Sequence, residues 1–259
     1  TAQIDALTTA QAAVLKTSQL AALNTEQAQA IATDDIAALT SAQLAGMGST
    51  QLAALTTAQV QALETADVAA IRSTVISSLT TEQIDALTTE QAAALKSTQL
   101  AALTTEQVQA IGTDDIAALT STQLGQMGST QLAALTTAQV QALETADLAA
   151  IRSTVIGSLT TEQIDVLTTE QAAGLKTTQI AALTTDQVQS LSTTQITALT
   201  TGQVSAMTTD QIAALTDSQV GALTTAQVRA LNADATTGQI KALSNEQVAS
   251  LSNAAIAAL

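Results

Sequence analysis

Several residue types are missing from this chain, and their absence argues against whole classes of functional site. The 259 residues include no cysteine, proline, histidine, phenylalanine, tyrosine or tryptophan. Without histidine and cysteine, zinc and haem sites lack their usual ligands, and a Ser-His-Asp triad is impossible. We therefore predict no catalytic, cofactor-binding or metal-binding residues, and we expect that the chain is not an enzyme.

Basic residues are scarce as well. Lysine and arginine total 7 against 22 acidic residues, which leaves a net charge of −15. Because lysine and arginine supply most of the affinity for nucleic acids and anionic lipids, we expect no nucleic-acid partner. No apolar run approaches the ~20 residues that span a bilayer, so we expect no membrane insertion.

What the chain does have is a strict eight-residue period. Every eighth residue from Leu7 to Leu231 is Leu, Ile or Met, and the series resumes at Leu243 after four extra residues near 232–235. Between these positions the chain reads, with variations, L-T-T-x-Q-[IVL]-x-A. A fixed short period of this kind indicates a repeat architecture.

A second, longer period contains the first. Residues 1–80 and 81–160 differ at 13 positions, and residues 161–240 form a third, diverged copy. Whole octads can be copied in this way when each unit packs only against its neighbours. We therefore predict one array over residues 1–259, with an irregular insertion near 232–235. Since the chain starts in mid-octad at Thr1, we expect it to be part of a longer array.

The octad is numbered here from its Leu, as positions one to eight. Position three is nearly always Ser or Thr, later Asp or Asn, which are the best helix N-cap residues. Position two with the Gln at position five also resembles a capping box. Since position two is elsewhere Lys16, Gly48, Glu64 or Arg72, position three is predicted to be the cap.

The remaining positions predict how octads hold together. Positions one and six are aliphatic and should form a shared seam, while the small residue at position eight lets neighbouring backbones approach. The near-constant Gln at position five, as at Gln3, Gln11 and Gln19, is predicted to bond backbone groups of the adjacent repeat. The alternative is that this Gln is only a solvated helix former.

These features predict an all-α fold, an elongated solenoid or superhelix of short capped helices with one helix per octad. A single continuous helix fails, because eight residues leave a rotation of ~80° and the Leu positions would spiral around it. A β-solenoid is the alternative, because Thr, Val and Ile suit strands. Against it, Ala and Gln dominate and turn glycines are few.

Carboxylates and threonines are the residues that could still carry a function. The carboxylates occur in pairs, namely Asp34 with Asp35, Glu64 with Asp67, and Asp114 with Asp115. Paired carboxylates can bind calcium or act as acid and base, but in a repeat array we interpret them as solvated first-turn helix charges. A ladder of threonine hydroxyls could match a periodic surface, although position two is too often interrupted for a flat ladder.

Octads such as the LTTEQAAA that begins at Leu87 and the LTTEQVQA that begins at Leu103 also carry a resemblance. They resemble the octapeptide tracts of very long bacterial surface proteins that are often described as adhesin-like or haem-utilisation-like. The resemblance covers nearly the whole chain and transfers no functional residue. It implies a secreted or cell-surface structural protein, either the stalk or spacer of an adhesin or the subunit of a fibre.

The expected partners are then the neighbouring repeats of a longer chain, with possible self-association into fibres and no cofactor. The alternative function is a binding module that presents a repeated face to a glycan, a surface or a protein partner.

Overall fold

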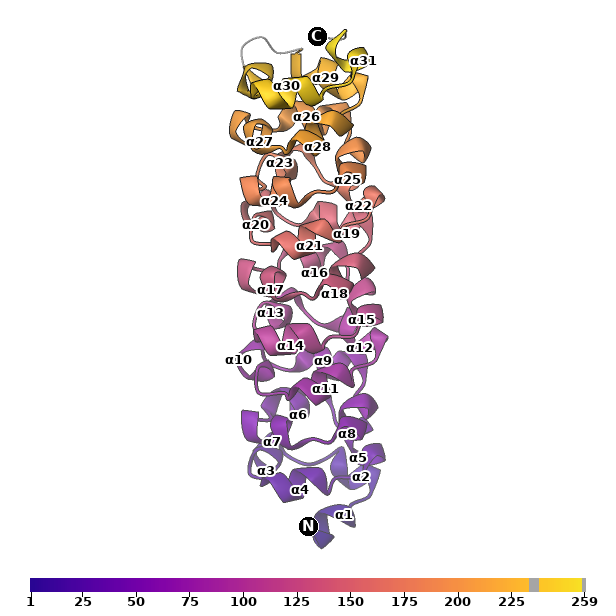
Figure 1. Ribbon diagram of the computed structural model, residues 1–259. Helices are drawn as coiled ribbons and strands as arrows, with labels where there is room; N and C mark the ends of the chain where they lie inside the picture. The colour runs from indigo at the N-terminus through magenta and orange to yellow at the C-terminus, as the bar shows by residue number, and fades with distance from the viewer. Residues whose placement is uncertain (233–237, 258–259) are drawn as a thin grey trace. The chain divides into compact units, whose positions relative to one another are not determined.

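The chain folds into a series of short α-helices, and no strand occurs among the described residues. The computed structural model describes residues 1–232 and 238–257. Two compact units are present, Thr1–Leu135 and Thr136–Leu259, and within each the helices succeed one another as separate short segments (Figure 1). The predicted all-α solenoid of short helices, one per octad, is confirmed, and the β-solenoid alternative has no support.

The first unit is built from helices α1 to α17. Their bounds are α1 Ala2–Asp5, α2 Thr9–Ala12, α3 Thr17–Ala21, α4 Thr25–Gln29, α5 Thr33–Ala37, α6 Ser41–Gly46, α7 Ser49–Ala54, α8 Thr57–Ala62, α9 Thr65–Ala70, α10 Ser73–Ile76, α11 Thr81–Asp85, α12 Thr89–Ala94, α13 Ser97–Leu100, α14 Thr105–Ala110, α15 Thr113–Ala117, α16 Ser121–Gly125 and α17 Ser129–Ala134.

The second unit is built from helices α18 to α31 and one 3₁₀ helix, η1. Their bounds are α18 Thr137–Ala142, α19 Thr145–Ala150, α20 Ser153–Ile156, α21 Thr161–Asp165, α22 Thr169–Gly174, α23 Thr177–Ile180, α24 Thr185–Ser190, α25 Thr193–Ala198, α26 Thr201–Ala206, α27 Thr209–Ala214, α28 Asp217–Ala222, α29 Thr225–Asn232, η1 Gln239–Ala242, α30 Asn245–Ser250 and α31 Asn253–Ile256.

The helix N-cap is position two of the octad, so the prediction of position three was wrong. Thr56 has extended backbone angles, φ −73° and ψ 159°, and Thr57 is the first helical residue. Thr56 Oγ1 accepts from the backbone N–H of Gln59 at 3.2 Å, and Gln59 Oε1 accepts from the backbone N–H of Thr56 at 2.7 Å. This reciprocal pair is the capping box that T-x-x-Q resembles.

The variety of residues at position two follows from this geometry. In the capping box, the glutamine side chain needs only the backbone N–H of position two. Lysine can therefore stand at this position, and the backbone N–H of Lys16 donates to Gln19 Oε1 at 2.8 Å. Where the side chain at position two has no suitable oxygen, the backbone N–H of position five can donate to the backbone carbonyl of position two. The backbone N–H of Gln99 donates in this way to the carbonyl of Lys96 at 2.9 Å. The helix cap at position two therefore does not require a particular side chain there, and the variety of residues at position two does not exclude it as the cap.

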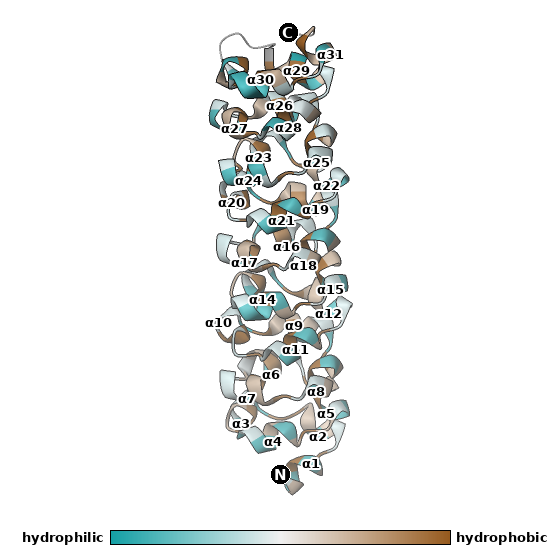
Figure 2. Ribbon diagram, viewed as in Figure 1, coloured by the Kyte–Doolittle hydropathy of each residue, from teal (hydrophilic) through white to brown (hydrophobic). Residues whose placement is uncertain are grey.

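Positions six and one form the core of each unit. The position-six side chains of Ile84, Ile116 and Leu132 are completely buried, and the position-one residues that follow them, such as Leu87, are nearly so. Hydrophilic residues lie along the outward sides of helices such as α4 and α14 (Figure 2). The predicted aliphatic seam is therefore present, and it continues from octad to octad.

Each unit winds as a superhelix in which one turn takes between three and four octads. Helix α6 packs against α3 and α9, and in the second unit α24 packs against α21 and α27. Side chains also bond to carbonyl groups 28 residues earlier, as from Gln83 to Leu55. Helices that are neighbours in space are thus three or four octads apart in sequence.

The predicted insertion near 232–235 lies outside the described residues except for Asn232, which ends α29. The three blocks 1–80, 81–160 and 161–240 within a single array stay a prediction.

Truncating a position-six side chain should destabilise the fold. We expect Ile84→Ala to lower the free energy of unfolding by about 2–5 kcal/mol, because the cavity lies in a closely packed seam. Thermal unfolding followed by circular dichroism measures the change. Val14→Ala is the control, since Val14 is 77% exposed; equal effects of the two substitutions would contradict the assigned core.

Candidate functional site

The described surface offers no enclosed site. Among residues 1–232 and 238–257 no cavity or cleft is found, and no three Asp, Glu, His or Cys side chains form a group that could hold a metal ion. None of the helices in these ranges combines the length and apolar character needed to cross a membrane. The feature that recurs instead is a row of buried polar side chains at position five.

A buried position-five glutamine such as Gln91 binds two coils at once. Gln91 is 2% exposed, and its Oε1 accepts from the backbone N–H of Thr88 at 2.9 Å. Its Nε2 donates to the carbonyls of Val60 at 2.9 Å and Leu63 at 2.7 Å, both in the preceding coil. One amide thus satisfies a helix N-terminus and two carbonyls that end an earlier helix, which suits groups that would otherwise be buried unpaired.

We call the glutamines with this contact the glutamine row. Their Nε2 atoms donate to a carbonyl 28 residues earlier at Gln43, Gln51, Gln59, Gln83, Gln91, Gln99, Gln107, Gln123 and Gln131 in the first unit and at Gln171, Gln179, Gln187, Gln195, Gln203, Gln211, Gln219 and Gln227 in the second.

The glutamine row continues past the four extra residues with a shifted register. Gln239 and Gln247 donate to the carbonyls of Met207 and Leu215, each 32 residues earlier instead of 28. The prediction that this Gln bonds backbone groups of an adjacent repeat is confirmed, with the qualification that the repeat is adjacent in space. Gln11 and Gln19 are exposed, and no described residue stands 28 positions before either of them.

Where position five is valine, an arginine makes the bond to the preceding coil. Val75 has no side-chain amide, but Arg72 at position two of the same octad donates from Nη2 to the carbonyl of Met47 at 3.1 Å. Met47 is the residue that a glutamine at position 75 would reach, since it stands one octad before the Leu55 that Gln83 binds. The sequence contained a signal for this exchange, because Arg152 and Val155 repeat the same pair.

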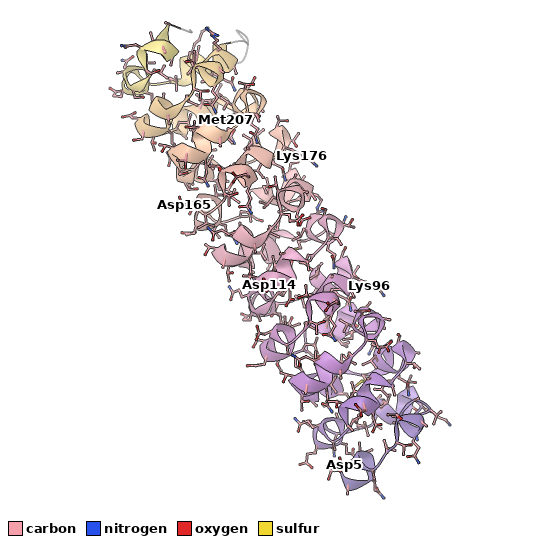
Figure 3. The ribbon with its side chains drawn as sticks, turned by 90° about the vertical axis from the view of Figure 1, so that its right-hand side faces the viewer. Asp5, Lys96, Asp114, Asp165, Lys176 and Met207 are labelled. Carbon is pink, nitrogen blue, oxygen red and sulfur yellow. The ribbon has the colours of Figure 1, made fainter. Side chains whose placement is uncertain are left out.

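The carboxylate pairs do not converge, because one member faces outward and the other inward. Asp34, Glu64 and Asp114 are exposed (Asp114 is labelled in Figure 3), whereas their partners at position five are 2%, 3% and 7% exposed. Those partners are Asp35, Asp67 and Asp115. The interpretation as solvated charges was therefore right for the first set and wrong for the second.

The buried carboxylates of Asp35 and Asp67 are incompletely hydrogen-bonded. Asp67 Oδ1 accepts from Ser41 Oγ at 2.8 Å, but its Oδ2 has no partner among the described residues, and neither has Oδ2 of Asp35. Burial raises the pKa of Asp115 above its ordinary value of 3.8. The hydroxyl of Thr89 opposes this shift, and the nearby charges of Asp114, Asp85 and Glu90 add to it.

Exposed glutamates at position four show the opposite shift. The pKa of each lies below the ordinary 4.5, because the carboxylate accepts from its own backbone N–H and then from a neighbouring Ser or Thr hydroxyl. Their place in the first helical turn agrees with the favourable helix dipole. These residues are Glu82, Glu90, Glu106, Glu162, Glu170 and Glu246.

Comparison with known proteins detects the same repeat. A family model described as the ALTTAQ repeat matches seven stretches, and together they cover more than half of the chain. The matched residues are 28–65, 60–97, 108–145, 140–177, 173–201, 189–217 and 201–233. A search of curated proteins finds no match.

Removing only the donor of one row glutamine should destabilise the array. We expect Gln91→Glu to lower the free energy of unfolding by about 1–3 kcal/mol at neutral pH, because the carbonyls of Val60 and Leu63 lose their donor. Chemical denaturation measures this loss. Gln11→Glu, which keeps the same cap bond in the first coil, should change stability by less than about 0.5 kcal/mol; a comparable loss there would show that the contact between coils is unimportant.

The arginine exchange can be tested by restoring the glutamine. We expect Arg72→Ala to cost about 0.5–1.5 kcal/mol, since the Met47 carbonyl loses its donor. Adding Val75→Gln should recover most of this loss, because the new amide is placed to reach the same carbonyl. Unfolding of the two single variants and the double variant forms a double-mutant cycle, and purely additive effects would refute the exchange.

Proposed function

Since the chain belongs to the ALTTAQ repeat family, we propose that it is a structural repeat protein: the stalk or spacer of an extracellular adhesin, or the subunit of a fibre. The proposal includes a secreted or cell-surface location and no enzymatic activity. The single observation that carries it is the glutamine row, in which the same contact bonds successive coils within each of the two units.

A contact that repeats without change lets length vary freely. Because a coil needs only the carbonyls of the coil before it, octads can be added or removed in blocks without disturbing distant residues. Such a fold suits a spacer, whose useful property is its length. A catalytic fold would instead require fixed contacts between distant parts of the chain.

The charge of the chain supports the same proposal. A net charge of −15 with few cations keeps a long array soluble and limits nonspecific contact with anionic surfaces. The polar residues that face outward are mostly short hydroxyl side chains, which hydrate well.

A binding module is the second candidate, and the repeated exposed hydroxyls favour it. Thr57 and Thr65 at position three are exposed on successive octads, and Thr113 is exposed at the same position farther along the chain. A partner with a matching repeat, such as a polysaccharide, could contact several of them together. Retention on insoluble glycans by the chain, and not by a version with shuffled octads, would favour this candidate over a spacer.

Duplicating residues 81–160 tests the spacer. We expect small-angle scattering to show a larger maximum dimension with one added block and twice that increase with two, while the thermal unfolding midpoint stays the same or rises. The reason is that each block brings its own aliphatic seam and its own glutamine row.

A shuffled block of the same composition is the matched control and should fail to add a regular increment. A maximum dimension that does not grow with intact blocks would overturn the spacer. Sedimentation over a range of protein concentrations separates a fibre subunit, which should associate, from a spacer, which should not.

A further inference from the structure

Aspartate replaces the position-five glutamine at the same two places in the first two blocks. These residues are 2–7% exposed, and the third block has glutamine at both places. The aspartates are Asp35 and Asp67, then Asp115 and Asp147, and the corresponding glutamines are Gln195 and Gln227.

An aspartate in this place can perform only half of the glutamine's task. Gln195 donates to the carbonyl of Leu167, 28 residues earlier, at 2.7 Å. An ionised carboxylate accepts hydrogen bonds and donates none. Accordingly, no donor among the described residues reaches the carbonyls of Leu39 or Leu87, which occupy the place of Leu167 with respect to Asp67 and Asp115.

A hydroxyl group of the preceding coil approaches the carboxylate instead. Ser41 Oγ donates to Asp67 Oδ1, and the side chain of Thr89 bonds Asp115; each lies 26 residues earlier, at position three. One hydroxyl does not satisfy a carboxylate, and Oδ2 of Asp35 and of Asp67 has no partner in the described part of the chain. Burying a charge with so few hydrogen bonds is unfavourable.

The charged groups around Asp35, Asp67 and Asp115 are almost all acidic. Asp115 lies near Asp114 on its own helix, Asp85 on α11 and Glu90 on α12, and these three charges raise its pKa.

Helix α9, which carries Asp67, packs against α6, which has no charged residue, and against α12, whose one charge is Glu90. Helix α5 with Asp35 packs against α2 and α8, which have none. Within their own octads lie Asp34 and Glu64, and the neighbouring Arg72 is directed to the Met47 carbonyl.

We propose that Asp35, Asp67 and Asp115 are proton-binding positions, which tighten the contact between coils in acidic solution and loosen it in neutral solution. A proton removes the buried charge and, at Asp35 and Asp67, supplies a donor at the oxygen that lacks a partner. The third block, with glutamine at both places, keeps its contacts at either pH.

The direction of the effect follows from Asp115. Folding raises its pKa, so its contribution to stability is fully present below the ordinary 3.8 and is lost as the pH rises through the folded value. The exposed glutamates, whose pKa is lowered, act oppositely: their contribution is present above 4.5 and is lost as the pH falls. Those glutamates are the same in every variant compared below.

The test compares two threefold variants that remove the same charge. One carries Asp→Asn at residues 35, 67 and 115. The other carries Asp34→Asn, Glu64→Gln and Asp114→Asn, all at exposed positions of the same octads. Thermal unfolding midpoints are measured from pH 4 to pH 7 at fixed salt.

Near pH 4 we expect the buried-site variant and the unchanged chain to have the same unfolding midpoint. At pH 7 the midpoint of the buried-site variant should be several degrees higher than that of the unchanged chain. The exposed-site variant should follow the unchanged chain. Parallel curves for the buried-site variant and the unchanged chain would overturn the proposal.

A second arm does not depend on that variant folding. Gln195→Asp with Gln227→Asp places the same residues in the third block, and hydrogen exchange corrected for intrinsic rates locates the response. Amides of helices α25 and α29 should become at least tenfold less protected at pH 7 than at pH 4.5, whereas the unchanged third block should show no such ratio. Protection that is independent of pH in the double variant would also overturn the proposal.

Discussion

The structure depends on one side-chain amide that is shared between two coils. The oxygen of a row glutamine closes the N-terminus of its own helix, and its nitrogen closes the end of a helix one coil earlier, as Gln91 does for Thr88 and Leu63. Very short helices leave a large share of their backbone groups unpaired. A buried fold of such helices is possible only if something pairs those groups systematically.

This sharing explains why the repeat has eight residues and tolerates so much variation elsewhere. Positions three to eight form one to two helical turns, and positions one and two are extended and lead into the next helix. Position two can be Thr, Lys or Gly, because the glutamine side chain accepts a hydrogen bond from the backbone N–H of that residue. Position five varies less: Val75 is compensated by Arg72, whereas Asp67 leaves a buried carboxylate.

The same contact links packing to the proposed role. Aliphatic residues at positions one and six supply the burial, but burial alone is non-directional and would not fix the register of one coil on the next. Hydrogen bonds to a carbonyl of the preceding coil set that register, as from Gln91 to Leu63. When four residues are added, the sequence interval grows with them and the contact is kept, which shows how changes of length can be absorbed.

Periodicity and local propensity are properties of the chain, so they were enough to predict the helical class, the eight-residue unit, the aliphatic seam and the importance of the glutamine. They were not enough to decide which of two threonines caps the helix, since both Thr56 and Thr57 suit a cap and only the backbone angles distinguish them. Nor could they separate exposed Asp114 from buried Asp115, which are adjacent in the chain. That difference arises from the number of octads per turn, which decides what lies across from each side chain and is fixed only when the coils pack.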